Sequence, residues 1–143
     1  MTVEITKLLN GMTVVTDNLE TLETVSLGIW VRAGPRFETI DNNGVSHLLE
    51  HMAFKGTAKR SARDIAEEIE NVGGQLNAFT ARETTAFHAT VLKDNVGIAI
   101  DIIGDILQNS VFDQEELERE RAVVLQEIGQ ALDTPDEIVF DHL

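Results

Sequence analysis

The sequence predicts an α+β domain in which a mainly antiparallel sheet is covered by helices. The chain starts with two strand-like stretches separated by Asn10-Gly11, a residue pair typical of a tight β-hairpin. Further strand-like stretches are interleaved with amphipathic helical patterns. No internal repeat and no Pro- or Gly-rich linker divides the 143 residues. We therefore expect residues 1–143 to form a single unit.

Apolar side chains alternate along the predicted strands, as they do when one face of a sheet is buried. The clearest case is the third strand, where Val25, Leu27, Ile29 and Val31 fall on one face. The expected strands are residues 3–9, 12–17, 25–31, 76–80 and 85–91.

The predicted helices are marked by capping residues and by apolar side chains three or four positions apart. Ser61 with Asp64 resembles a capping box at the start of one helix. Asp94 is expected to cap another, and Asp113 opens a long last helix that Pro135 bounds. The expected helices are residues 45–54, 61–72, 94–107 and 113–132.

The composition excludes several classes of protein. The chain has no cysteine, so any metal must be held by His, Asp or Glu. The formal net charge of −14 argues against a nucleic-acid partner and is compatible with a basic peptide, although acidity for solubility alone is the simpler explanation. No stretch reaches about 18 uninterrupted apolar residues, which argues against membrane insertion.

The clearest chemical signal is the stretch HLLEH, which runs from His47 to His51. On a helix these two histidines lie four residues apart on one face, so both imidazoles can be directed at one ion. Glu50 projects beside them, where it can take a proton from a water that attacks a carbonyl. A catalytic zinc ion takes three protein ligands, so this stretch lacks one. The alternative is a helix that carries these polar residues without a metal.

The long helix predicted over residues 113–132 offers the missing ligand. Glu120 and Glu127 lie along the edge of its apolar stripe. A zinc ion facing Glu127 would compensate for the burial of its carboxylate, and Glu120, two turns earlier, would support the site from behind. The alternative is that both glutamates are solvated flank residues, as glutamates on helices usually are.

Several other side chains have simpler structural interpretations. Phe54, Phe79 and Trp30 are expected to pack in the core, although Phe54 lies close to His51 in the sequence. His88 lies in a predicted strand with no second ligand nearby in the sequence, so we expect no catalytic role for it.

HLLEH, together with Glu127 at 76 positions after His51, resembles the HxxEH…E signature of the inverzincin peptidases. This is the family of insulin-degrading enzyme, pitrilysin and mitochondrial processing peptidase. The stretches NNGVSHLLEHMAFKGT, GGQLNAFTARETTAFHATVL and ELERERAVVLQEI resemble successive blocks of the N-terminal catalytic domain in the processing-peptidase branch. The resemblance covers nearly the whole chain.

The resemblance implies a zinc metalloendopeptidase that hydrolyses extended peptides. His47, His51 and Glu127 match the zinc ligands of the family, and Glu50 matches its general base. Glu120 matches the acidic residue seven positions before the ligand glutamate, and we count it with Glu50 among the catalytic residues.

The resemblance also implies where a substrate binds. Asn77 and Ala78 fall on the edge strand of the family, to which an extended substrate adds by backbone pairing. Phe54 matches the apolar residue that lines the pocket just after the scissile bond. The acidic balance of the chain, together with the processing-peptidase branch, suggests basic, presequence-like peptides.

Family members carry two similar α+β domains in tandem, so the resemblance implies that residues 1–143 are a truncated N-terminal catalytic domain with deficient activity by itself. An incomplete sheet leaves an unpaired edge, so we expect a homodimer or a heterodimer with a related subunit. The start of the chain has no leader-like segment, which favours the bacterial cytoplasm, with the mitochondrial matrix as the alternative.

Two competing functions follow from the same residues. The chain can be a non-catalytic subunit that contributes a chamber wall to a related peptidase, and loss of HxxEH would be the mark of such a subunit. It can also bind zinc structurally, but a structural site usually closes with four protein ligands and only three are evident. The intact motif favours the peptidase.

Overall fold

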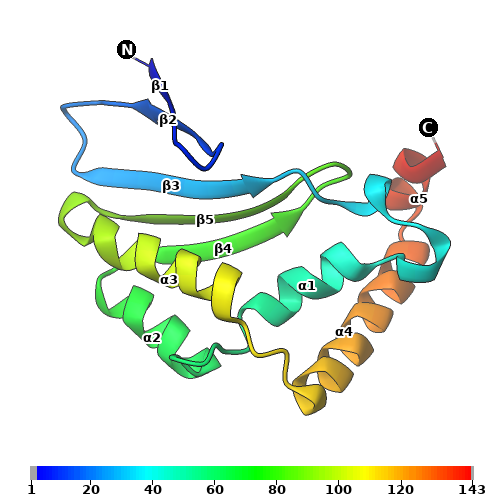
Figure 1. Ribbon diagram of the computed structural model, residues 1–143. Coiled ribbons are helices and arrows are strands. Elements are labelled where there is room, and N and C mark those ends of the chain that lie inside the picture. The colour runs from blue at the N-terminus through cyan, green and yellow to red at the C-terminus, as the bar shows by residue number, and fades with distance from the viewer. Residues whose placement is uncertain (1–2, 143) are drawn as a thin grey trace.

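The computed structural model describes residues 3–142 and confirms the α+β fold class (Figure 1). Three antiparallel strands form one sheet in the order β3-β5-β4, and the N-terminal hairpin forms a separate two-stranded sheet. The strands are β1 (Val3–Lys7), β2 (Thr13–Asp17), β3 (Thr24–Val31), β4 (Gln75–Thr80) and β5 (Thr85–Leu92).

The helices lie on one face and at one edge of the three-stranded sheet (Figure 1). They are α1 (Val45–Ala53), α2 (Ala62–Asn71), α3 (Val96–Asn109), α4 (Gln114–Leu132) and α5 (Pro135–His142). Within the described residues, none of these helices has the length and apolar character needed to cross a membrane.

The hydrophobic core lies between the sheet and the helices packed beneath it. Strand β5 is the central strand and supplies Phe87, which is paired in register with Ile29 of β3 and Ala78 of β4. The other members of the core include Ala53, Ile65, Ile69, Ala89, Val91, Ala99, Ile102, Ile103 and Ile106. Burial of this apolar surface is the main force that holds α1, α2 and α3 against the sheet.

Two aromatic residues that we expected in the core lie on the opposite face of the sheet. Trp30 and Phe79 both pair in register with Ala86, and their side chains are 62% and 44% exposed. The expectation was wrong for both, because neighbouring residues of a strand point to opposite faces and the helices cover only the face that carries Phe87.

One helix boundary differs from the prediction and another agrees with it. Asp94 lies in a short 3-10 turn, Lys93–Asn95, and α3 begins at Val96 with Asn95 as its N-cap, so the predicted capping role of Asp94 was wrong. Helix α4 ends at Leu132, before Pro135, as predicted, and Pro135 begins a further short helix. Pro135 occupies the first position of α5, where its missing N–H costs nothing.

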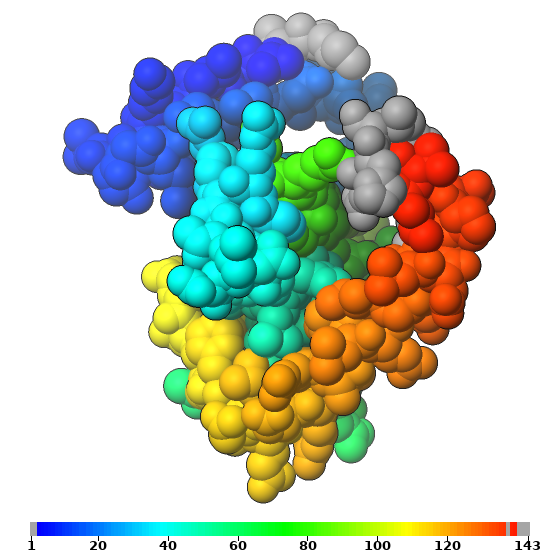
Figure 2. All heavy atoms as spheres, turned by 90° about the vertical axis from the view of Figure 1, so that its right-hand side faces the viewer, coloured from blue at the N-terminus to red at the C-terminus, as the bar shows by residue number. Residues whose placement is uncertain are grey.

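Helix α1 and helix α4 contact each other beside strand β4, which is an edge strand of the described sheet. On the face shown in Figure 2, α4 (orange) lies beside α1 (teal). This arrangement brings segments distant in the sequence to one edge of the sheet.

The loop between α1 and α2 is held to α3 by a buried ion-pair cluster. The Arg60 side chain is 6% exposed and its Nη1 lies 2.8 Å from Oδ2 of Asp105. Arg60 also donates to Asp101 and Glu68, and the Thr57 hydroxyl donates to Asp105 at 2.8 Å. These contacts satisfy the buried guanidinium and fix the chain directly after α1.

We expect Asp105→Asn to destabilise the chain more than Asp101→Asn, because the two side chains are 6% and 54% exposed. The hydrogen bond from Arg60 lowers the pKa of Asp105, burial opposes this, and Thr57 and Asn109 lower it further. A depressed folded pKa stabilises the fold above the ordinary pKa of about 3.9 and stops doing so as the pH falls through the folded pKa.

The measurement is urea unfolding of both variants and the wild type, followed by circular dichroism, at about pH 7 and about pH 3. The loss of unfolding free energy in Asp105→Asn relative to the wild type should be large at neutral pH and smaller in acid. Equal unfolding of the two variants at neutral pH would contradict the role given to this cluster.

Candidate metal centre

Helix α1 directs two histidines to the same side. His47 and His51 lie one turn apart, and their Nε2 atoms are 3.2 Å apart. The rings meet edge to face, with an interplanar angle of 78°. The helical spacing therefore converges two ring nitrogens on one point, as predicted from HLLEH.

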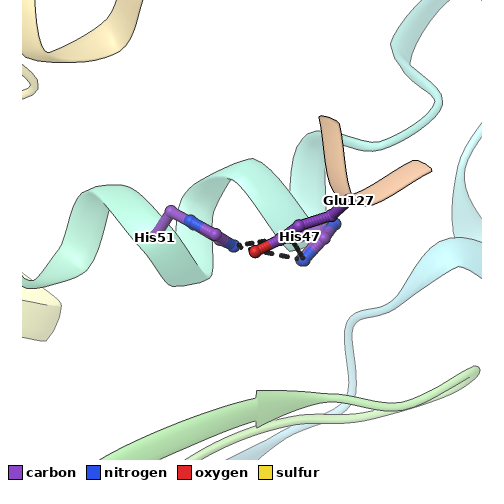
Figure 3. A group of neighbouring side chains, drawn as sticks. All are labelled: His47, His51 and Glu127. Carbon is purple, nitrogen blue, oxygen red and sulfur yellow. Dashed lines mark hydrogen bonds and ion pairs between the residues drawn. The ribbon is translucent and has the colours of Figure 1, made fainter. Parts of the chain in front are cut away.

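Helix α4 brings Glu127 to the same point (Figure 3). One of its carboxylate oxygens, Oε2, lies 3.3 Å from Nε2 of His47 and 3.4 Å from Nε2 of His51. Among the described residues, this is the one group of His, Asp and Glu side chains whose ligand atoms are close enough to hold one ion. The structure thus joins residues 76 positions apart in the sequence.

The spacing of these three atoms fits a zinc ion. Donors placed tetrahedrally about 2.0–2.1 Å from zinc lie about 3.3–3.4 Å from one another. The observed separations are 3.2, 3.3 and 3.4 Å. Two imidazoles and one carboxylate also form a donor set that zinc takes in hydrolytic enzymes, and three donors leave the fourth position of the tetrahedron open.

Glu120 holds His51 from behind. Nδ1 of His51 donates to Oε2 of Glu120 at 3.0 Å, and Nζ of Lys55 lies 2.6 Å from Oε1 of the same carboxylate. Burial raises the pKa of Glu120, but the hydrogen bonds from Lys55 and His51 outweigh it and hold the pKa below its ordinary value. A charged Glu120 requires the proton on Nδ1, which leaves the lone pair on Nε2 directed at Glu127.

Sequence reasoning missed Lys55 as the second partner of Glu120. Lys55 lies four residues after His51, just beyond the last residue of α1. The same four-residue spacing that singled out the histidines could have marked it.

Three further candidate residues lie on one side of the donor group, at a cavity that His51 also lines. Glu50, Phe54 and Asn77 line one open cavity together with His51 and Glu120. Phe54 also packs on the core, with its ring centroid 6.3 Å from that of Phe87, so both interpretations of this residue apply.

The side chain of Ala78 is buried in the core, so only its backbone groups are available at the edge of β4. Its N–H donates to Oδ1 of Asn77 at 2.8 Å, while β5 is paired on the other side of the strand. In an antiparallel pair, alternate residues point their N–H and C=O away from the partner strand. The N–H of Ala78 therefore lies on the free edge of β4, beside the donor group.

His88 lies outside the donor group. It is on β5, where it pairs in register with Asn77 and Gly28, and its ring centroid is 6.1 Å from that of Phe79. We keep the prediction that it has no catalytic role.

Residues 13–143 match the family described as insulinase, peptidase family M16. The β subunit of mitochondrial-processing peptidase from Dictyostelium discoideum is 52% identical over 141 residues, which cover 98% of this chain and 30% of that protein. An uncharacterized zinc protease from Bacillus subtilis is 46% identical over 134 residues, covering 94% of this chain and 33% of that protein.

A solved structure gives the same result. The crystal structure of a protease from Helicobacter pylori superposes with a TM-score of 0.83 at 26% sequence identity, covering 88% of this chain and 30% of that one. The chain thus spans about a third of the length of these relatives. The matched family, the named relatives and the shared fold confirm the predicted resemblance, and this chain belongs to the insulinase family of peptidases.

Proposed function

We propose that this chain forms the catalytic, zinc-binding part of a zinc-dependent endopeptidase. The observation that carries the proposal is the convergence of His47, His51 and Glu127 at the separations of a tetrahedral zinc site. Glu50 lies beside this site, because it and His51 line the same cavity. Relatives of the chain that are named zinc proteases support the choice of metal.

His47, His51 and Glu127 would hold the zinc ion, which supplies the positive charge that polarises the scissile carbonyl. Glu50 accepts the proton of the attacking water and transfers it to the nitrogen of the leaving amine. Glu120 does not touch the reacting atoms. It orients His51 and keeps its proton on Nδ1, so we now regard it as a positioning residue.

An extended peptide would add to the free edge of β4. The outward N–H of Ala78 offers a backbone donor once Oδ1 of Asn77 releases it, and the Asn77 amide is then free to bind the peptide. Phe54 borders the same cavity and would accept an apolar side chain after the scissile bond. The net charge of −14 favours basic peptides, such as presequences, over acidic ones.

The remaining parts of the proposal concern the protein beyond these residues. Because the relatives are about three times as long, we propose that residues 1–143 are one N-terminal domain of the enzyme and that substrate closure involves further segments. Relatives named as β subunits support assembly with a related subunit. We propose the bacterial cytoplasm as the location, with the mitochondrial matrix as the alternative, and relatives named from bacteria and from mitochondria are compatible with both.

A chamber subunit without activity is the competing proposal, and Glu50→Gln separates the two. In the protein at its full natural length, this change should lower peptide hydrolysis by about 100-fold to 10,000-fold, because Gln cannot accept the proton of the attacking water. Zinc content should be unchanged, because Glu50 is not among the three donors. The measurements are cleavage of a basic, unstructured peptide and zinc analysis of the same samples.

Glu67→Gln is the matched control, since Glu67 lies on α2 and pairs with Arg63. It should keep both activity and zinc. Zinc-loaded wild-type protein without any hydrolysis would favour the chamber subunit, and an active Glu50→Gln variant would remove Glu50 from the role of base.

Ala78→Pro tests the edge-strand proposal. Proline removes the outward N–H without removing a bond to β5, and edge strands accept proline at such positions. We expect KM for the peptide to rise by about 2-fold to 10-fold, the value of one hydrogen bond, with zinc affinity unchanged. Ala81→Pro is the contrasting variant, because the N–H of Ala81 pairs with Thr84 and its loss should destabilise the hairpin. An unaltered KM in a folded Ala78→Pro variant would exclude this binding mode.

A further inference from the structure

Helix α1 lacks a capping side chain of its own. Its N-cap residue is Gly44, with φ of 90°, and no side chain there can accept from the first N–H groups of the helix. Unsatisfied N–H groups favour fraying of the first turn. The third residue of the helix is His47, so fraying would displace one of the three proposed zinc ligands.

The carboxylate of Glu38 occupies the position of the missing cap. Its Oε2 accepts from the N–H of Gly44 at 2.6 Å, and its Oε1 accepts from the N–H of Ser46 at 2.8 Å. A negative charge at the start of a helix is also favourable for the helix dipole. Burial raises the pKa of Glu38, but the hydrogen bonds from Ser46 and Gly44 outweigh it and lower the pKa, which keeps the cap charged.

The segment that carries Glu38 is itself tied to the β4–β5 hairpin. The N–H of Arg36 donates to the carbonyl of Arg82 at 2.9 Å. A Cβ at Gly34 would lie 2.5 Å from the carbonyl oxygen of Ala81, so glycine allows the two backbones to approach closely. In Figure 2, the segment before α1 (cyan) lies against the green strands of this hairpin. Glu38 therefore links the start of α1 to the strand pair that includes β4.

The two histidines differ in how they are held. The ring of His51 is held by Glu120, and its side chain is 18% exposed. The side chain of His47 is 37% exposed, and within the described part of the chain no side chain binds its second ring nitrogen. The position of His47 thus depends on the backbone of the first turn of α1.

We infer that Glu38 is a positioning residue, which fixes the first turn of α1 and thereby sets His47 against Glu127. This inference rests on the proposed zinc site and deepens it. Without the cap, the first turn must be ordered when the metal binds, and the apparent zinc affinity equals the intrinsic affinity multiplied by the fraction of molecules in which this turn is ordered.

The test is the zinc affinity of Glu38→Ala, measured by competition with a chromophoric chelator at a temperature where every variant is folded. The loss of a helix cap predicts zinc binding about 2-fold to 30-fold weaker than in the wild type. Glu38→Gln keeps one acceptor oxygen, so its zinc affinity should lie between those of the wild type and Glu38→Ala. If Glu38→Ala does not fold, Glu38→Gln provides the test.

Asp64→Ala is the matched control. The Asp64 carboxylate accepts from the N–H of Ser61 at 2.9 Å and takes part in the capping box of α2, away from the donor group. This variant should lose stability like Glu38→Ala and keep wild-type zinc affinity. Cobalt(II) gives a second readout, because loss of His47 as a ligand weakens the visible bands of a tetrahedral site whereas lower stability alone does not.

Weaker zinc binding in Glu38→Ala but not in Asp64→Ala supports the inference. Equal affinity in Glu38→Ala and the wild type, or equal weakening in both variants, overturns it while leaving the proposed function in place. A wild-type chain that binds no zinc overturns the proposed function, and the inference with it.

Discussion

The contact between His51 of α1 and Glu120 of α4 is the interaction on which the rest of the site depends. It joins two helices that are separated in the sequence by α2, the β4–β5 hairpin and α3. It selects the tautomer that leaves the Nε2 lone pair of His51 directed at Glu127. Glu127 lies on α4, two turns after Glu120. Lys55 compensates for the buried charge of Glu120.

The fold supports this contact from three sides. The core packs α1, α2 and α3 under one face of the sheet, and the cluster around Arg60 fixes the chain where it leaves α1. Glu38 fixes the chain where it enters the same helix. Strand β4 presents its free edge beside α1, so the donor group and the backbone groups proposed to hold a peptide share one border of the sheet.

Local patterns predicted the parts of the molecule that depend on local geometry. HLLEH has helical spacing, and the edge of an apolar stripe marked Glu120 and Glu127, because both follow from the period of a helix. The exposure of Trp30 was not predictable in this way, since alternation separates two faces of a strand without telling which face is covered.

Contacts across the fold were beyond these patterns. Glu38 lies in a segment without regular spacing relative to α1, and its capping role depends on how the β4–β5 hairpin places that segment. Phe54 shows the same limit, because it serves the core and borders the cavity at once. Tertiary packing determines such roles, so they cannot be predicted from the period of a helix or a strand.

The most direct test of the central claim is a zinc titration of the chain beside its Glu120→Gln variant, with Glu118→Gln as the control on the same helix. Glu118 is exposed and pairs with Arg121, away from the donors. We expect one zinc ion per wild-type chain, the same zinc affinity in Glu118→Gln, and about 10-fold to 100-fold weaker zinc binding in Glu120→Gln. Equal zinc affinity in all three proteins would contradict the claim that Glu120 sets His51 for metal binding.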